Sequence, residues 1–147
     1  MFIWLILLVA LIYFGVRAYR KSQANKAIFA TTMQRINTEY GTSFPFDASG
    51  ADLILGNGST SGSLVFDPTT KKLCFVTAPD RAEVLDYAYI RKWELKWVEV
   101  TKGTNISHKN VHFVFSTNDI KRPLLTIPVR GKAHGDIWHS RLGILLA

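Results

Sequence analysis

The sequence predicts an α+β protein in which an N-terminal transmembrane helix is followed by antiparallel strands and a C-terminal helix. Three observations support this prediction. Residues 2–16 carry no charged side chain, residues 51–129 contain short apolar runs of the kind that form strands, and residues 133–147 return to helical spacing. These changes divide the chain into an anchor at 1–19, a juxtamembrane helix or linker at 20–41 and a β domain at 42–147.

The anchor is predicted from its length and its apolar composition. As a helix, residues 2–19 would rise about 27 Å, close to the roughly 30 Å hydrocarbon core of a bilayer. Leu, Ile, Val and Phe dominate this stretch, and aromatic or basic residues near its ends suit the membrane–water interface. The predicted membrane-interface residues are Trp4, Arg17, Tyr19, Arg20 and Lys21.

The placement of charge predicts the orientation of the anchor. No Lys or Arg precedes the apolar run, whereas Arg17, Arg20, Lys21 and Lys26 follow it. The positive-inside rule therefore puts the N-terminus outside and the rest of the chain in the cytoplasm. A cleaved signal peptide would carry its positive charge before the apolar run. A secreted or periplasmic domain and a buried core helix are the alternatives.

The net charge of +7 is densest beside the predicted anchor. Residues 1–40 contain five basic residues and Glu39, which gives +4, and the remainder of the chain contributes +3. Basic residues directly after an apolar span favour contact with anionic lipid headgroups over nucleic acid, which is a disfavoured partner. The single cysteine, Cys74, excludes an intramolecular disulfide.

Residues 20–41 contain one apolar stripe at helical spacing. Its members are Phe29, Met33, Ile36 and Tyr40, and Gly41 supplies a helix stop. The favoured interpretation is that the stripe docks onto the domain that follows. Self-association as a short coiled coil and contact with another membrane protein are the alternatives.

The strand-like runs suggest about six strands closed by one helix. They lie at residues 51–55, 63–66, 73–77, 87–101, 111–115 and 124–129. The Pro-containing turn at 67–72 predicts a hairpin, a change of apolar phase near Trp97 and Val98 predicts a bulge, and Pro128 predicts an edge strand. Residues 78–83 are interpreted as a break between strands.

The C-terminal segment is predicted to be an amphipathic helix. Asp136 is the expected N-cap, and Trp138, Leu142 and Leu145 fall on one stripe.

The order of these elements resembles that of a known family. A central run at 90–95, a later strand at 113–119, a turn from Asn118 to Pro123 and a terminal helix bearing Trp138 are similar to the pleckstrin-homology-like (PH-like, GRAM-like) domains of small bacterial single-pass membrane proteins. The resemblance covers residues 52–147. It implies two roughly orthogonal sheets in a partly open β-barrel, capped by the helix, at the bacterial inner (plasma) membrane.

What the resemblance implies about function divides into lipid binding and protein binding. Lipid-binding members use basic residues in the loop between their first two strands, and the corresponding residues here, 56–62, contain none. The remaining candidates for headgroup or partner binding are Lys71, Lys72, Lys121 and Arg122. This departure favours a membrane-anchored, non-enzymatic interaction or scaffolding module whose partners are the bilayer and another protein. An anionic-lipid or envelope sensor is the alternative.

The sequence contains no recognised catalytic or cofactor motif. It has no Gly-x-Ser-x-Gly elbow, no P-loop and no dinucleotide-binding glycine pattern. His134 and His139 are five residues apart and would not share one helix face, and His108 and His112 straddle a loop and a strand, so no metal or cofactor is expected. An enzyme whose site is assembled only by folding is the third interpretation.

Overall fold

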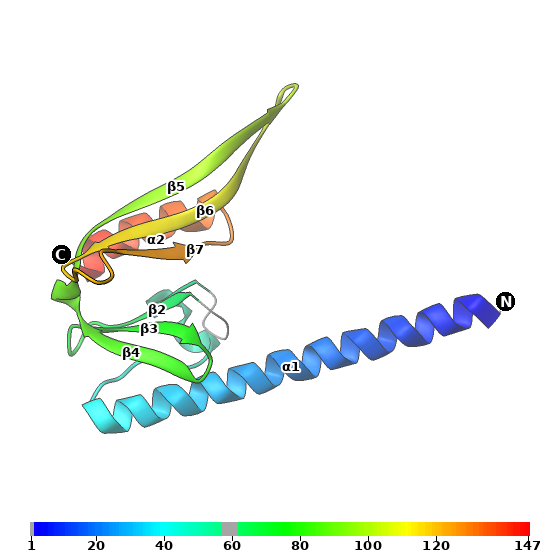
Figure 1. The fold of residues 1–147 in the computed structure, drawn as a ribbon, viewed down its shortest axis with the longest axis horizontal. Helices are drawn as coiled ribbons and strands as arrows, with labels where there is room; N and C mark the ends of the chain where they lie inside the picture. Colours follow the sequence, from blue (N-terminus) through cyan, green and yellow to red (C-terminus); the bar gives the residue numbers. More distant parts are fainter. Residues whose placement is uncertain (1, 57–61) are drawn as a thin grey trace.

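The computed structural model describes residues 2–56 and 62–147 and shows an α+β protein with a long N-terminal helix (Figure 1). The loop expected at 56–62 lies largely outside the described residues. The helices are α1 (Phe2–Tyr40) and α2 (Lys132–Leu145), with 3-10 turns at Ala48–Leu53 and Tyr87–Tyr89. The strands are β1 (Ile54–Leu55), β2 (Ser63–Asp67), β3 (Lys72–Ala78), β4 (Arg81–Asp86), β5 (Ile90–Lys102), β6 (Asn105–Thr117) and β7 (Leu124–Pro128).

The strands form two antiparallel sheets. The first has the order β1-β2-β3-β4 and the second has the order β5-β6-β7. Within each sheet, strands that follow one another in the sequence pair with each other, and the turn Tyr87–Tyr89 carries the chain from β4 in the first sheet to β5 in the second. Within the described residues neither sheet closes on itself, so the structure shows two open sheets and not a closed barrel.

Helix α1 joins the apolar N-terminal segment to the β domain without a break. It is long and apolar enough to cross a membrane, and none of its most apolar 18-residue window is buried, although an N-terminal signal sequence would meet the same criterion. Its other end lies along the first sheet (Figure 1). There Phe29, Met33 and Ile36 are buried, as the apolar stripe predicts, whereas Tyr40 at the end of the helix is exposed.

The first sheet has a core on each of its faces. Val65, Cys74 and Val76 point to one face and cluster with Phe29, Met33 and Ile36 of α1 and with Phe44. The alternate residues, including Leu64, Phe66 and Leu73, point to the other face and form the main core with the second sheet and α2. Trp138 of α2 is fully buried in this core, with its ring centroid 5.9 Å from that of Phe66.

Asn37 and Asp67 fix the chain where it leaves α1. Gly41 has a positive φ of 66°, and the helix ends there as expected. The Asn37 side chain accepts hydrogen bonds from the Phe44 amide and the Thr42 hydroxyl and donates one to the Phe44 carbonyl. The buried Asp67 carboxylate accepts a 2.9 Å hydrogen bond from the Ser43 amide. These bonds attach the end of α1 to the first hairpin.

Several local predictions are confirmed. β2 and β3 form the expected hairpin around residues 67–72, and β7, which contains Pro128, is an edge strand. The register of β5 and β6 shifts between Lys96 and Val98 as predicted, with the extra residue on β6, where Asn110 has a φ of 53°.

Three local predictions are wrong. Residues 81–86 are a strand, β4, and not part of a break, because they pair with β3 along the sheet edge. β6 begins at Asn105, six residues before the expected 111. Asp136 is not the N-cap of α2: the helix begins at Lys132 after Gly131, and Asp136 lies inside it, with its carboxylate 3.1 Å from the Lys132 Nζ.

Candidate functional site

The predicted membrane-interface residues all project from the N-terminal half of α1. Trp4 and Tyr19 have exposed fractions of 78% and 65%, and Arg17, Arg20 and Lys21 are also exposed. Because the whole segment is one helix, these five side chains have fixed heights along a single axis. They lie apart from the buried face of α1, whose first buried residue is Phe29.

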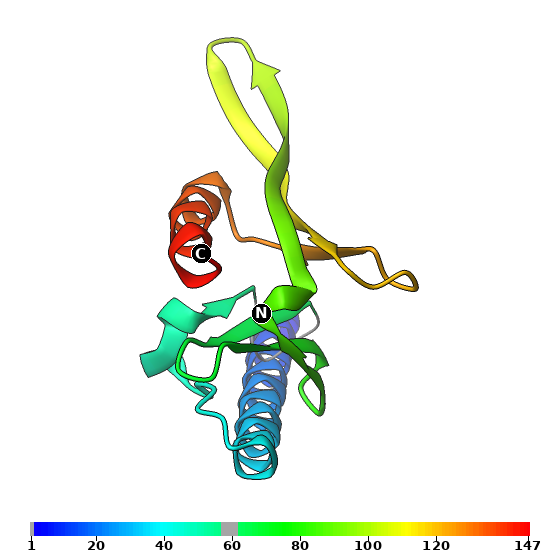
Figure 2. The same ribbon diagram turned by 90° about the vertical axis from the view of Figure 1, so that its left-hand side faces the viewer.

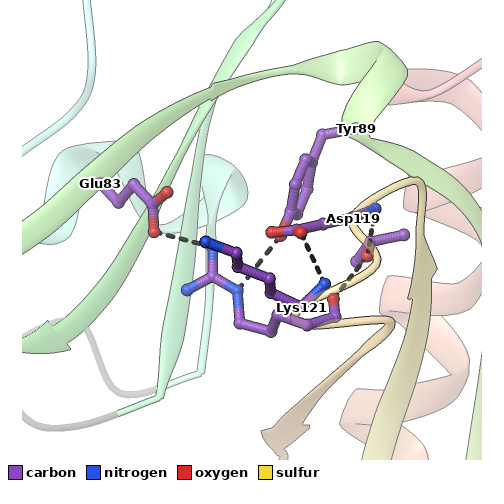
Figure 3. A network of polar contacts seen from close by, with 6 residues as sticks. Glu83, Tyr89, Asp119 and Lys121 are labelled. Carbon is purple, nitrogen blue, oxygen red and sulfur yellow. Dashed lines mark hydrogen bonds and ion pairs between the residues drawn. The ribbon is translucent and has the colours of Figure 1, made fainter.

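Arg122 is the centre of a polar network that joins the two sheets (Figure 3). It lies in the turn between β6 and β7. Its Nη2 atom donates a 2.7 Å hydrogen bond to Glu83 of β4, and its Nε donates a 3.1 Å bond to the Tyr89 hydroxyl. The Tyr89 hydroxyl in turn donates to Asp119 at 3.2 Å. Glu83 belongs to the first sheet, so the network crosses between the sheets.

Aromatic rings and backbone bonds hold Arg122 in this position. Its guanidinium carbon lies 5.3 Å from the ring centroid of Phe75 and 5.8 Å from that of Tyr89, within the range of cation–π attraction. The Thr117 hydroxyl donates a 2.6 Å hydrogen bond to the Arg122 carbonyl, which fixes the turn. The bonds to Glu83 and then to Tyr89 raise the pKa of Arg122 above its ordinary value.

The structure does not gather the four predicted headgroup-binding residues into one site. Lys72 forms a 2.7 Å ion pair with Asp86 and shares a strand face with Cys74 and Val76, which pack toward α1. Arg122 contacts Phe75 on the other face of the same strand. Lys71, with a φ of 55°, and Lys121 are exposed residues in two different turns. Two of the four cations therefore already have carboxylate partners.

This arrangement makes the Arg122 network a connection between sheets and not an open anion site. A guanidinium that already faces a carboxylate has less electrostatic attraction left for a phosphate. An exposed ion pair such as Arg122–Glu83 contributes at most about 1 kcal/mol to the stability of the fold. Most of the stabilisation by the network therefore comes from the two ring contacts and the Tyr89 hydrogen bond that Arg122 makes in addition. Sequence reasoning could not detect it, because Glu83 and Arg122 are 39 positions apart.

Burial and neighbouring groups shift the pKa values of Cys74, Tyr87 and Asp67. Burial, followed by the charge of Glu83, raises the pKa of Cys74 to about 12, so its thiol stays protonated at neutral pH. Burial, followed by the charge of Asp67, raises the pKa of Tyr87 to about 12. Burial alone would raise the pKa of Asp67, but hydrogen bonds from Thr70 and from nearby amides outweigh it and leave the pKa below its ordinary value of 3.8.

The histidines lie in separate places. His108 is 3.8 Å from Glu99 across the β5–β6 ladder, and an Nδ1 contact of 2.7 Å joins His112 to the Asn110 carbonyl. Burial, followed by the charges of Arg130 and Arg141, lowers the pKa of His134. In the part of the chain that the structure describes, no group of three or more His, Cys, Asp or Glu residues is placed to hold a metal ion.

A further surface is the free end of the β5–β6 hairpin, which we call the arm (residues 97–110). β7 pairs only with residues 112–116 of β6, so the arm extends beyond the sheet as two strands paired with each other (Figure 2). Trp97, Val98 and Ile106 expose 41%, 53% and 60% of their surface. The sequence predicted the β5 part of the arm within the run at 87–101 but not the β6 part, because residues 105–110 lack the alternation of a half-buried strand.

Comparison of the chain with protein-family models, with curated proteins and with solved structures finds no match.

Proposed function

We propose that this protein is a single-pass membrane protein that displays a β domain on the cytoplasmic face as a non-enzymatic interaction or scaffolding module. The observation that supports this proposal is the continuity of α1. One helix carries both the apolar segment and the buried face formed by Phe29, Met33 and Ile36. The domain would therefore stand at a fixed height above the bilayer.

The orientation in this proposal comes from charge. The basic residues Arg17, Arg20 and Lys21 follow the apolar segment on α1, which favours an N-terminus outside and a cytoplasmic β domain. We further propose that residues 52–147 form a PH-like domain of a bacterial inner-membrane protein. The support is the order of a four-stranded sheet, a three-stranded sheet and a C-terminal helix that places Trp138 in the core.

The partner surface in this proposal is the end of the domain remote from the N-terminus. The β6–β7 turn lies at that end (Figure 1). Ile120 in this turn is 96% exposed, and Leu124 just after it is 57% exposed. Exposed apolar side chains commonly take part in protein contacts, and these two come from one short segment of the chain. Tethering would increase the occupancy of a weak contact, because confinement to the membrane raises the effective concentration of the two partners.

Site-specific photocrosslinking in intact cells tests this function. A benzophenone amino acid at Ile120 or Leu124 should give a covalent adduct of the same size from both positions. The same probe at the exposed Thr77 on β3 should give none. Absence of an adduct from Ile120 and Leu124, or equal adducts from all three positions, would contradict the proposed interaction surface.

The alternative of an anionic-lipid or envelope sensor acting through Lys71, Lys72, Lys121 and Arg122 has less support. Lys72 and Arg122 face Asp86 and Glu83 at 2.7 Å. Headgroup phosphates would have to compete with these carboxylates.

A further inference from the structure

The arm extends in the direction of the N-terminus along the length of α1, while it diverges sideways from that helix (Figure 1). Its tip is displaced from the rest of the β domain in the direction of the N-terminus and is level with the middle of α1, on the opposite side of the molecule from that helix (Figure 1). The turn at the tip contains Gly103, with a φ of 61°, between Lys102 and Thr104. The β6–β7 turn lies at the opposite end of the same sheet (Figure 1).

The lengths of the two elements agree with a contact at the membrane surface. Arg20 and Phe29 are nine residues apart on α1, which corresponds to about 14 Å along the helix axis. From Trp97 to Gly103 the arm extends about 20 Å. Because the apolar segment is barely long enough to span a bilayer, α1 has little freedom to tilt. An arm that leans toward the N-terminus would therefore reach the headgroup layer.

The side chains at the tip suit the surface of an anionic membrane. Lys102 and Ile106 lie beside the turn, and Ile106 is 60% exposed. Over residues 96–110 the chain carries Lys96, Lys102 and Lys109 against a single acid, Glu99. Within the described residues Lys102 has no carboxylate partner, whereas Lys96 faces Glu94 and Glu99 faces His108. Lys102 pairs with Asn105 and Ile106 pairs with Thr101, so the two side chains lie on opposite faces of the arm. A tip that meets the membrane end-on would combine headgroup attraction on one face with apolar burial on the other.

We infer that the tip of the β5–β6 arm, residues 101–106, contacts the anionic lipid surface of the same membrane that holds α1. Lys102 faces the lipid phosphates and Ile106 enters the interfacial region. This second contact fixes the rotation of the domain about α1 and directs the β6–β7 turn away from the bilayer. The inference rests on the proposed membrane anchoring, and the experiment below separates the failure of one from the failure of the other.

The test uses the full chain in nanodiscs of phosphatidylcholine, with or without phosphatidylglycerol, that contain headgroup spin-labelled lipid. An NBD fluorophore is placed on Thr104→Cys at the tip, on Val9→Cys in the apolar segment or on Lys121→Cys in the β6–β7 turn. Cys74 is fully buried, so the fluorophore attaches to the introduced cysteine. The inference predicts quenching at Thr104 that increases with phosphatidylglycerol, together with no quenching at Lys121.

The outcomes at the three positions are distinct. A Val9 probe shielded from water beside an unquenched Thr104 probe would overturn the arm contact and leave the anchor intact. A Val9 probe exposed to water would overturn the anchor and the arm contact together. Quenching at Lys121 equal to that at Thr104 would overturn the inferred orientation.

Two variants separate the effect of the positive charge at the tip from the effect of the length of the arm. Lys102→Glu should weaken the tip contact at least fivefold, because one lysine contributes about 1 kcal/mol at an anionic surface, whereas a paired Lys71→Glu, Lys121→Glu change should leave it unaltered. Deleting Glu99, Val100, Ser107 and His108 shortens each strand by two residues, or about 7 Å, and keeps the tip sequence.

The shortened arm also loses its only acid, so an effect of charge alone would increase quenching at Thr104. If the length of the arm decides the contact, quenching at Thr104 should fall to the level of the Lys121 probe. Unchanged or increased quenching in the shortened protein would overturn the inference, as would a larger effect of the Lys71 and Lys121 changes than of Lys102→Glu.

Discussion

Met33→Ala tests whether α1 is part of the folded domain. Met33 is fully buried in a cluster with Val65, Cys74 and Val76 of the first sheet, so truncation removes a large apolar side chain from a packed contact. Met→Ala substitutions in protein cores cost about 2–5 kcal/mol. Because this cluster lies on the outer face of the sheet and can partly collapse, we expect about 2–3 kcal/mol, a large share of the stability of a small domain.

Ile28→Ala is the matched control on the same helix. Ile28 is 44% exposed, and alanine has the higher helix propensity, so we expect a change below about 0.5 kcal/mol. The free energy of unfolding of both variants would be measured by chemical denaturation in detergent micelles, followed by tryptophan fluorescence. Equal stabilities for Met33→Ala and Ile28→Ala would refute the docking of α1 on the sheet.

Four further substitutions should change stability in the same assay. Arg122→Lys should destabilise the protein by about 1–2 kcal/mol, because lysine cannot bond Glu83 and the Tyr89 hydroxyl together while stacking on two rings. Asp67→Ala should cost about 3 kcal/mol, because the Ser43 amide and the Thr70 hydroxyl lose a buried charged acceptor. Gly56→Ala should cost about 2 kcal/mol or more, because Gly56 has a φ of 92° and a Cβ there would lie 2.7 Å from the Gly62 carbonyl oxygen. Gly143→Ala is the contrasting change. Gly143 is a helical position with open space around it, so alanine there should stabilise the protein by up to about 1 kcal/mol.

The contribution of Asp67 should also depend on pH. Its folded-state pKa is below the ordinary value of 3.8, so the stabilisation is complete above about pH 4 and is lost as the pH falls through the folded pKa. The stability difference between the native protein and Asp67→Asn should therefore shrink on acidification. A stability difference that stays constant from pH 7 to pH 2 would contradict the role of the Asp67 carboxylate as a charged hydrogen-bond acceptor. For the Arg122 network, an Arg122→Lys variant as stable as the native protein would contradict its stabilising role.

The sequence was most informative where one face of an element is buried. The spacing of Phe29, Met33 and Ile36 predicted the face of α1 that packs on the first sheet, and Pro128 predicted an edge strand. β4 was missed because Pro79 and Asp80 resemble a break and because this edge strand is only partly buried. The extended β6 was missed for a related reason, since the arm is exposed on both faces.

The candidate site depended on contacts that no local pattern contains. The turns that hold Lys71, Lys72, Lys121 and Arg122 were visible in the sequence, but their carboxylate partners were not. Lys72 meets Asp86 through the register of β3 and β4, and Arg122 meets Glu83 only because the two sheets pack together. Asp136 was misassigned because Gly131 begins the helix without a side-chain cap.

The most direct test of the central claim is the distance between α1 and the far end of the β domain. Spin labels on Gln23→Cys and Ile120→Cys, both exposed positions, would be measured by double electron–electron resonance on the full chain in nanodiscs. A continuous helix docked on the sheet predicts one narrow distance distribution, which Met33→Asp should broaden. A broad distribution in the native protein would show that the domain hangs on a flexible linker and would contradict the account.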